Sequence, residues 1–412
     1  MSENIDRLWN KNFMLLIVGQ IISLFGNTIL RFAMPLYILE ISGSPAIFGT
    51  ISALSFLPMV IMSPVGGILA DRVNKKNVML ILDFITAILI TIYIAAISGQ
   101  FSGVSSTVIT MMALFAIQGM MTPTVQSSVP SIAPQSQLVR ANAIVNLITS
   151  LSGMVAPVIG GILFASFGLL PILYVSVACF LLAVFLEIFI KIPHVKQPKN
   201  TGVFNIIKGD MSAGLRFIIK EKPLIAKSVA IIFIFNIVLS SMLLIGLPVI
   251  VTQNLGMESN MFGFTQAALM SGGLLGGALA GIFGNKLSID KLPLMLLICS
   301  LSTIPMCLVL WIEPSDFISW LVITTMAPIT MSSATLFTVL IFTFVQSQTP
   351  LEILGKVMSF IMAISLAAQP LGQFVFGMLF EGFYETPWIV VGLSSVASIA
   401  VSFYSRTVFK NI

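Results

Sequence analysis

Charged residues are scarce in this sequence. Only 8% of its 412 residues are Asp, Glu, Lys or Arg, whereas 57% are hydrophobic. Soluble globular domains carry about 25% charged residues, so the composition excludes an ordinary soluble protein. The mean hydropathy of +1.07 indicates instead a chain that is embedded in a lipid bilayer.

The residues that usually carry catalysis or hold metals are equally rare. His194 is the only histidine, and Cys179, Cys299 and Cys307 fall in apolar segments at spacings that match no metal site. No nucleotide-binding loop and no pairing of a nucleophile with a base is visible. The sequence therefore predicts no enzyme, no cofactor and no metal site, with the cysteines as packing residues.

Long uncharged stretches divide the chain into predicted membrane spans. A bilayer core of about 30 Å requires roughly 20 apolar residues in a helix. One span each is predicted in residues 13–30, 41–70, 228–257, 262–285, 292–312, 317–351, 357–380 and 386–405, and two each in 84–139 and 141–186. The first stretch is too long for a cleavable signal, so we expect it to be retained. The predicted fold class is an all-α membrane protein with twelve transmembrane helices.

Basic residues gather on one predicted face of the membrane. With twelve spans both termini share a face, and placing it in the cytoplasm puts nineteen of the twenty Lys and Arg there, with Arg31 as the exception. The connections on the other face carry Glu40, Glu258, Glu313, Asp316, Glu381 and Glu385. Basic residues are retained inside during insertion. We therefore predict a multi-pass protein of the cytoplasmic membrane with both termini inside, and no nucleic-acid partner.

One long polar segment separates six spans from six. It predicts an N-terminal six-helix bundle over 1–191, a cytoplasmic linker over 192–227 and a C-terminal six-helix bundle over 228–412. Apolar residues recur at helical spacing within the linker, at Phe204, Ile207, Met211, Leu215 and Ile218. This pattern favours an amphipathic helix on the inner membrane surface. A solvated tether is the alternative.

The two predicted bundles resemble each other in sequence. Shifted by 214 positions, GILADR at 67–72 aligns with GIFGNK at 281–286, and shifted by 216, GILF at 161–164 aligns with GMLF at 377–380. Agreement at nearly one offset indicates two parallel, pseudo-symmetric repeats. Transporters that rock two halves about a site near the bilayer midplane are built in this way.

The connection after the second span holds the densest charge in the apolar part of the chain. Its motif is Gly-x-Leu-Ala-Asp-Arg-x-Asn-Lys-Lys, and its key residues are Gly67, Asp71, Arg72, Lys75 and Lys76. A glycine here would let a neighbouring helix approach closely, and an acid suits the N-terminus of a helix. The alternative is that the cations only fix the topology of the chain.

This motif resembles the signature loop between helices 2 and 3 of the major facilitator superfamily. The motif departs from the family at Asn74, where glycine is usual, although asparagine also tolerates a left-handed turn. The resemblance covers the whole chain. It extends to the macrolide-efflux and enterobactin-exporter-like branch, the third drug/proton antiporter family, through LWNKNF at 8–13, Asp83 and the segment 214–223. It implies the major facilitator fold, and it implies that the loop is an inner gate in which Asp71 pairs with basic groups.

A glycine-rich segment in the fifth predicted helix resembles the antiporter motif of exporting family members. It contains Gly153, Pro157, Gly160 and Gly161, with Ala156 where glycine is commoner. Small residues permit close helix packing, and proline supplies a bend. A tight helix contact without any transport role is the alternative.

Polar residues in the spans predict a cavity. Gln20, Asn27 and Arg31 fall on one stripe of the first helix, and the resemblance implies that helices 1, 4, 7 and 10 line a central cavity. The predicted substrate-cavity residues are Gln20, Asn27, Arg31, Gln118, Gln126, Asn146, Asn236, Gln266 and Gln369. Hydrogen bonding between helices is the alternative for each amide. Arg31 either binds an anionic group of the substrate or extends to the outer interface.

Embedded acids, which proton antiporters usually require, are almost missing. Asp83 and Asp71 are the candidates for proton coupling, and Glu187 stands one turn before Lys191. The resemblance implies a proton-coupled exporter of an amphiphilic small molecule, such as a drug, a macrolide-like antibiotic or a siderophore. The expected partners are this substrate, protons and membrane lipids, with a monomeric chain. A lysophospholipid flippase of the same fold and a non-transporting receptor or scaffold are the alternatives.

Overall fold

The structure is a computed structural model that describes residues 8–99, 103–134, 137–192, 215–283 and 289–409. These residues form helices and connections, without a strand among them. Twelve of the helical segments are long and apolar enough to cross a membrane. The predicted fold class, with twelve transmembrane helices, is confirmed.

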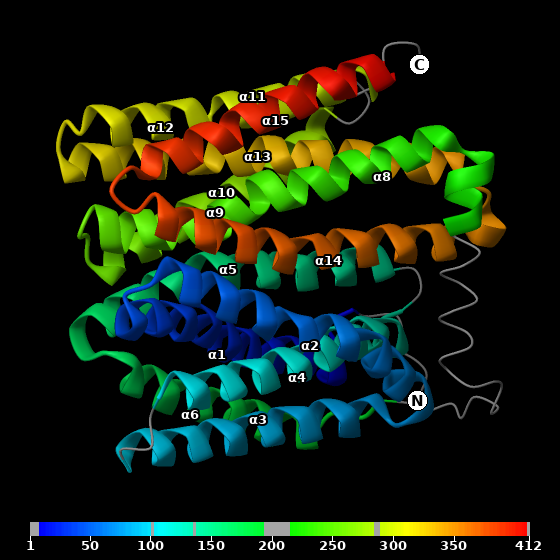
Figure 1. Cartoon of the computed structure of the whole chain (residues 1–412). Helices are drawn as coiled ribbons and strands as arrows, with labels where there is room; N and C mark the ends of the chain where they lie inside the picture. The colour runs from blue at the N-terminus through cyan, green and yellow to red at the C-terminus, as the bar shows by residue number, and fades with distance from the viewer. Residues whose placement is uncertain (1–7, 100–102, 135–136, 193–214, 284–288, 410–412) are drawn as a thin grey trace. The chain divides into compact units, whose positions relative to one another are not determined.

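Six single helices make up the described part of the first half of the chain, and they are labelled α1 to α6 in Figure 1. They are α1 (Lys11–Ser42), α2 (Pro45–Arg72), α3 (Lys75–Ser98), α4 (Val104–Ile132), α5 (Leu138–Phe167) and α6 (Leu169–Ile188). The helix α1 begins after Asn10, whose side chain accepts a hydrogen bond from the Phe13 N–H at 2.9 Å, and it ends at Gly43, which has a φ of 61°. A glycine adopts this left-handed conformation without steric cost.

The predicted end of the first span, at residue 30, is wrong. The charge of Arg31 interrupts the uncharged run, but the helix continues to Ser42 with Pro35 inside it. A charged side chain does not break the backbone hydrogen bonds of a helix, so charge marks the helix end poorly. Arg31 therefore lies well inside α1.

The second half contains six spans, two of which are divided into several segments. Its elements are η2 (Phe217–Glu221), α8 (Pro223–Phe235), η3 (Asn236–Ser240), α9 (Ser241–Pro248), η4 (Val249–Asn254), α10 (Ser259–Phe283), η6 (Ile289–Lys291), α11 (Leu292–Leu301), α12 (Thr303–Ile312), α13 (Asp316–Gln348), α14 (Leu351–Gly382) and α15 (Pro387–Phe409). The seventh span runs through α8, η3, α9 and η4, and the ninth through η6, α11 and α12. Short π-helical segments interrupt the seventh span at Asn236–Ser240 and again at Val249–Asn254.

The chain divides into two compact units by its internal contacts. The first unit is Met1–Gly43 with Leu54–Asn200, and the second is Ser44–Ala53 with Thr201–Ile412. The first residues of α2 thus group with the second unit. Most of the predicted linker, 193–214, lies outside the described residues, so the surface helix and the domain boundaries stay predictions. In the described end of the predicted linker, the side chains of Phe217 and Ile218 are buried.

Equivalent helices pack in the same pattern in both units. In the first unit α1 packs on α5 and α6, and α3 packs on α4 and α6. In the second unit the seventh span packs on α14 and α15, and α11 packs on α13 and α15. This shared pattern agrees with the two parallel repeats that the sequence predicts.

Glycines let two helix pairs touch backbone to backbone. In the first unit, a Cβ on Gly119 of α4 would stand 2.5 Å from the carbonyl oxygen of Met59 in α2. In the second unit, a Cβ on Gly276 of α10 would stand 2.5 Å from the carbonyl oxygen of Ser332 in α13. Close approach of this kind strengthens packing where there is no hydrophobic driving force between helices.

Candidate functional site

The predicted gate connection is short and ordered by hydrogen bonds. Helix α2 ends at Arg72 and α3 begins at Lys75. Asn74 between them is extended, with φ −60° and ψ 117°, and its side chain accepts a hydrogen bond from the Lys76 N–H at 3.0 Å. The expectation of a left-handed turn at Asn74 is therefore wrong. Asparagine serves here as the N-cap of α3, a position it strongly favours.

Gly67 does not provide the close helix contact that the sequence predicts. A Cβ at Gly67 would meet no described atom within 4 Å, whereas a Cβ at the preceding Gly66 would overlap the backbone of Met120 in α4. Successive residues point about 100° apart around a helix. Only one of the two glycines can face α4, and it is Gly66.

The two lysines of the connection bind the ends of neighbouring helices. The Lys75 ammonium donates to the Ser127 carbonyl at 2.7 Å and to the Ser131 hydroxyl at 2.9 Å, both in the last turns of α4. The Lys76 ammonium donates to the Ile188 carbonyl, at the end of α6, at 2.5 Å. A cation is stabilised at a helix C-terminus by the aligned peptide dipoles. These lysines therefore have a packing role besides any effect on topology.

For Arg72 and Asp71, the role in an inner gate stays a prediction. Arg72 is exposed, and the backbone of Asp71 lies in the last turn of α2. The side chain of Asp71 lies outside the described residues.

The glycine-rich segment of α5 packs against α1. A Cβ on Gly160 would stand 3.0 Å from Ile29 and 3.1 Å from Phe32. Ala156 is fully buried, and Pro157 and Gly161 are buried as well, while Gly153 is half-buried. The segment thus forms a tight helix contact, and a role in antiport stays a prediction.

The polar stripe of α1 changes from buried to exposed along the helix. Gln20 is buried, Asn27 is half-buried and Arg31 is exposed. The Arg31 guanidinium carbon lies 4.5 Å from the ring centroid of Phe115 in α4. Arginine stacks well on aromatic rings. This contact directs Arg31 toward the α1–α4 face of the first unit.

The other predicted cavity amides have varied surroundings. Gln118 donates to the Thr122 hydroxyl at 3.2 Å, and Asn236 donates to the Ile232 carbonyl at 3.0 Å, each within its own helix. Gln126 and Asn146 are exposed, and Gln266 and Gln369 are half-buried. Residues up to Asn146 belong to the first unit and the other three to the second. Their common role as a substrate cavity stays a prediction.

Two acidic side chains are buried together inside the first unit. Asp83 of α3 is 2% exposed and Glu187 of α6 is 1% exposed, and both lie against one stretch of α1, where a Cβ on Gly19 would stand 4.0 Å from the Glu187 side chain. Ser23 of α1 donates to Asp83 Oδ1 at 3.1 Å. Among the described residues, Asp83 Oδ2 and both carboxyl oxygens of Glu187 have no hydrogen-bond partner. The described residues contain no group of three or more metal-ligating side chains.

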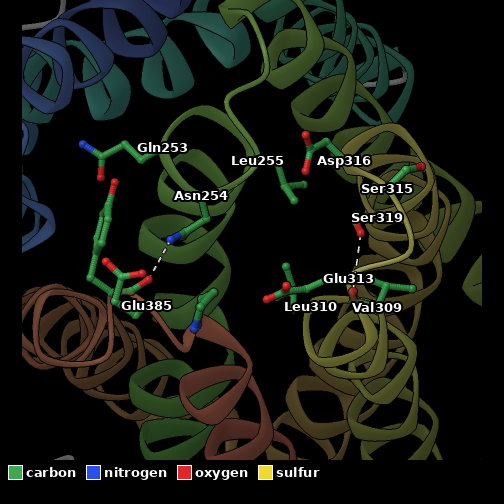
Figure 2. Close-up of a pocket in the computed structure, with 12 residues that line it drawn as sticks. Gln253, Asn254, Leu255, Val309, Leu310, Glu313, Ser315, Asp316, Ser319 and Glu385 are labelled. Atoms are coloured by element: carbon green, nitrogen blue, oxygen red, sulfur yellow. Dashed lines mark hydrogen bonds between the residues drawn. The ribbon is translucent and has the colours of Figure 1, made fainter.

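A separate pocket lies in the second unit (Figure 2). Its volume is about 280 Å³, and its acidic lining residues are Glu313, Asp316 and Glu385. The Asn254 amide donates to the Tyr384 carbonyl at 2.9 Å on one side, as the dashed line shows. None of the predicted substrate-cavity residues is among those that line it. The pocket is therefore distinct from the predicted cavity.

Comparison with known families decides what kind of protein this is. The family model described as Major Facilitator Superfamily matches residues 16–373. The chain belongs to the major facilitator superfamily. The family resemblance drawn from the gate motif is thus confirmed, and the protein is a transporter of this superfamily.

The relatives of this major facilitator protein include exporters. It is 25% identical to macrolide efflux protein A of Streptococcus pyogenes over 278 residues, which is 67% of this chain and 68% of the relative. It is 24% identical to macrolide efflux protein A of Enterococcus faecalis over 237 residues, which is 57% of this chain and 72% of the relative.

Solved structures of other transporters share the fold. The nucleoside transporter NupG has a TM-score of 0.76 at 13% identity, covering 97% of this chain and 99% of that one. A bacterial homologue of the lysosomal transporter Spinster, in an inward-facing conformation, has a TM-score of 0.73 at 15% identity, covering 97% of both chains. At such low identity the likeness shows the fold alone.

Sequence reasoning missed the burial of Glu187. Its position one turn before Lys191 indicated an ordinary charge near a span end. The buried residues of α6 show otherwise, because Ser176, Phe180, Ala183 and Glu187 follow one another at spacings of three or four. That spacing marks a single helix face. The sequence of α6 is apolar on all sides, so only the structure identifies this face as the buried one.

Proposed function

We propose that this transporter exports an amphiphilic small molecule, such as a drug, a macrolide-like antibiotic or a siderophore, and that protons drive the export. The similarity to macrolide efflux protein A carries this proposal, since it extends over two thirds of the chain. The polar stripe of α1, which runs from buried to exposed, supports it, because polar side chains on a membrane helix serve a cavity or a partner.

The proposed mechanism is alternating access by a monomer. The two repeats rock about a cavity lined by the predicted residues of α1, α4, the seventh span and their neighbours. The Asp71 connection closes the cytoplasmic side, with both termini in the cytoplasm of a cell whose plasma membrane holds the protein. Arg31, beside Phe115, binds an anionic group of the substrate.

Transport into everted membrane vesicles tests the proposed substrate class. Vesicles with the transporter should accumulate a labelled macrolide or catecholate when they are energised, and vesicles without it should not. Accumulation of labelled lysophospholipid alone would replace the exporter with a lipid flippase. Vesicles that move none of the three would contradict the proposal.

An ionophore tests the driving force separately. Collapse of the proton gradient should abolish accumulation while leaving binding of the substrate to the purified protein intact. Accumulation that persists without the gradient would show that protons do not drive export. Labelling of single cysteines placed in the connections tests the orientation, because a connection predicted to be inside should react only after the membrane is permeabilised.

A further inference from the structure

We propose that Asp83 and Glu187 form the proton-binding site of this transporter, as a buried carboxyl pair that holds one exchangeable proton. The proposal rests on the proton-driven export proposed above. It adds Glu187, on α6, to the candidates for proton coupling that the sequence provides. It places the bound proton in the interior of the first unit.

Burial requires that the pair carry a proton. Asp83 is 2% exposed and Glu187 is 1% exposed, and three of their four carboxyl oxygens have no hydrogen-bond partner among the described residues. An ionised carboxylate that is taken out of water without a partner is strongly disfavoured. Two such charges side by side also repel each other. Protons on the pair remove both costs, and they belong to the pair rather than to one residue.

Among the residues that the structure describes, no cation of the neighbouring helices neutralises the pair. Lys75 and Lys76, which precede Asp83 on α3, donate to the ends of α4 and α6 instead. On α1, which packs on α6, the charged residues are Lys11, Arg31 and Glu40, and all three are exposed. Arg31 stacks on Phe115.

The other two neighbours of the pair contribute no charge to it either. The described part of α4, which packs on α3, contains no charged residue from Val104 to Ile132. On α5, which packs on α1 and α6, Arg140 is exposed. Lys191, one turn beyond Glu187, is exposed, and its backbone N–H donates to Asn12.

Packing alone does not explain why acids occupy this position. In the second repeat the equivalent helices, α12 and α15, are joined by a hydrogen bond of 2.7 Å between the hydroxyls of Thr303 and Ser395. Farther along, the Ser402 hydroxyl donates to the Pro293 carbonyl at 2.7 Å. Neutral side chains thus join the equivalent helices of the second repeat, and α11, α12 and α15 contain no acid. The carboxyl pair is specific to the first repeat.

The pair is joined directly to the helix that carries the polar stripe. Ser23, whose hydroxyl donates to Asp83 Oδ1 at 3.1 Å, lies on α1 between Gln20 and Asn27. An ionised Asp83 accepts this hydrogen bond more strongly than a protonated one. Gain or loss of the proton therefore changes the strength of the contact between α3 and α1. This contact links the state of the pair to the predicted substrate side chains.

Infrared difference spectroscopy tests the site without any transport. Purified wild-type protein should show a carbonyl band of protonated carboxyl that disappears as the pH is raised. The band should be lost or shifted in Asp83→Asn and in Glu187→Gln, and it should be unchanged in Glu258→Gln, which removes an exposed acid. A band that is absent in the wild type, or that is unchanged in both variants, would overturn the proposal.

A second measurement guards against variants that do not fold. Wild-type protein labelled with carbon-13 in its glutamate carboxyls should show part of the titrating band shifted, and labelling of aspartate should shift the other part. If neither label shifts the band, the pair is excluded as the proton site. Sodium chloride at constant pH should leave the band unchanged. If sodium removes it, the site binds a metal cation and the proposal is wrong.

Vesicle transport separates this proposal from the proposed function. Glu187→Gln and Asp83→Asn should lose gradient-driven accumulation and retain exchange of labelled for unlabelled substrate, because exchange needs no net proton movement. Wild-type accumulation that ignores the ionophore would overturn proton-driven export. Suppose instead that wild-type accumulation requires the gradient and that the double variant accumulates substrate equally well. This result would overturn the assignment of the proton site to the pair and leave proton-driven export standing.

Discussion

Gly119 in α4 lies directly against the backbone of Met59 in α2, so that a Cβ on Gly119 would stand 2.5 Å from the Met59 carbonyl oxygen. The contact is reciprocal, because Gly66 in α2 faces the backbone of Met120 in α4. Two glycines, one from each helix, therefore set the distance between α2 and α4. Gly67 is adjacent in sequence but faces away from this contact.

Gly119→Ala and Gly66→Ala should each destabilise the protein. The added methyl group would collide with backbone, which cannot rotate away, and such overpacking costs roughly 1–3 kcal/mol. Gly67→Ala is the matched control and should unfold at the wild-type temperature. Thermal unfolding of the purified variants in detergent measures all three. A Gly67→Ala variant less stable than Gly66→Ala would contradict this packing.

Lys75→Met should destabilise the end of α4. It removes a cation that donates to the Ser127 carbonyl and the Ser131 hydroxyl. Hydrogen bonds to charged groups contribute about 1.5–3 kcal/mol each at most, and less at a partly exposed site. Hydrogen exchange of the last turn of α4 should accelerate. Arg72→Met, in the same connection but exposed, should leave that exchange unchanged, and an equal effect of both would refute the prediction.

Arg31→Gln should reduce export of anionic substrates selectively. It removes the guanidinium that lies over Phe115, and loss of a charged hydrogen bond to an anion corresponds to roughly tenfold or more in affinity. Arg31→Lys should retain part of this export, and export of an uncharged macrolide should change little. Competition assays in vesicles with paired anionic and neutral substrates measure the difference. Equal export of both by all three proteins would remove Arg31 from the binding site.

Glu381→Ala should loosen the start of α2. The Glu381 carboxylate accepts a hydrogen bond of 2.7 Å from the Ser44 hydroxyl and one of 3.2 Å from the Ala46 N–H. An acceptor at a helix N-terminus contributes about 0.5–2 kcal/mol. Glu385→Ala, four residues away in the lining of the second-unit pocket, is the control. Faster amide exchange near Ala46 in the Glu381 variant alone is the expected result, and its absence would count against the contact.

The twelve spans were predictable because charge is excluded from the bilayer core. The positions of Asp71, Arg140, Lys191 and Lys291 separate apolar runs of nearly the right length. The end of α1 was not predictable by that rule. Arg31 has a neighbour, Phe115, that holds its charge beside another helix. A rule that uses charge alone cannot include such a contact.

Contacts between helices were less predictable than the helices. The pair Gly66–Gly67 shows the reason, since sequence reveals a place where helices approach but not which of two adjacent residues faces the partner. Asn74 shows a similar limit. An asparagine fits both a left-handed turn and an N-cap, and only the backbone dihedrals of Asn74 distinguish the two. Glu187 shows the same limit, because α6 is apolar on all sides and its sequence does not mark the buried face.

Under the proposed proton-driven export, the neutral contact between Thr303 and Ser395 bears on the energy available for each turnover. With a buried carboxyl pair in the first repeat only, the proposal provides one exchangeable proton for each export event. One elementary charge that crosses a membrane potential of 100 mV releases about 2.3 kcal/mol. For an uncharged cargo this corresponds to a concentration ratio of roughly fifty-fold. Steeper gradients would require a second ion, and α11, α12 and α15 of the second repeat carry hydroxyl side chains but no carboxyl.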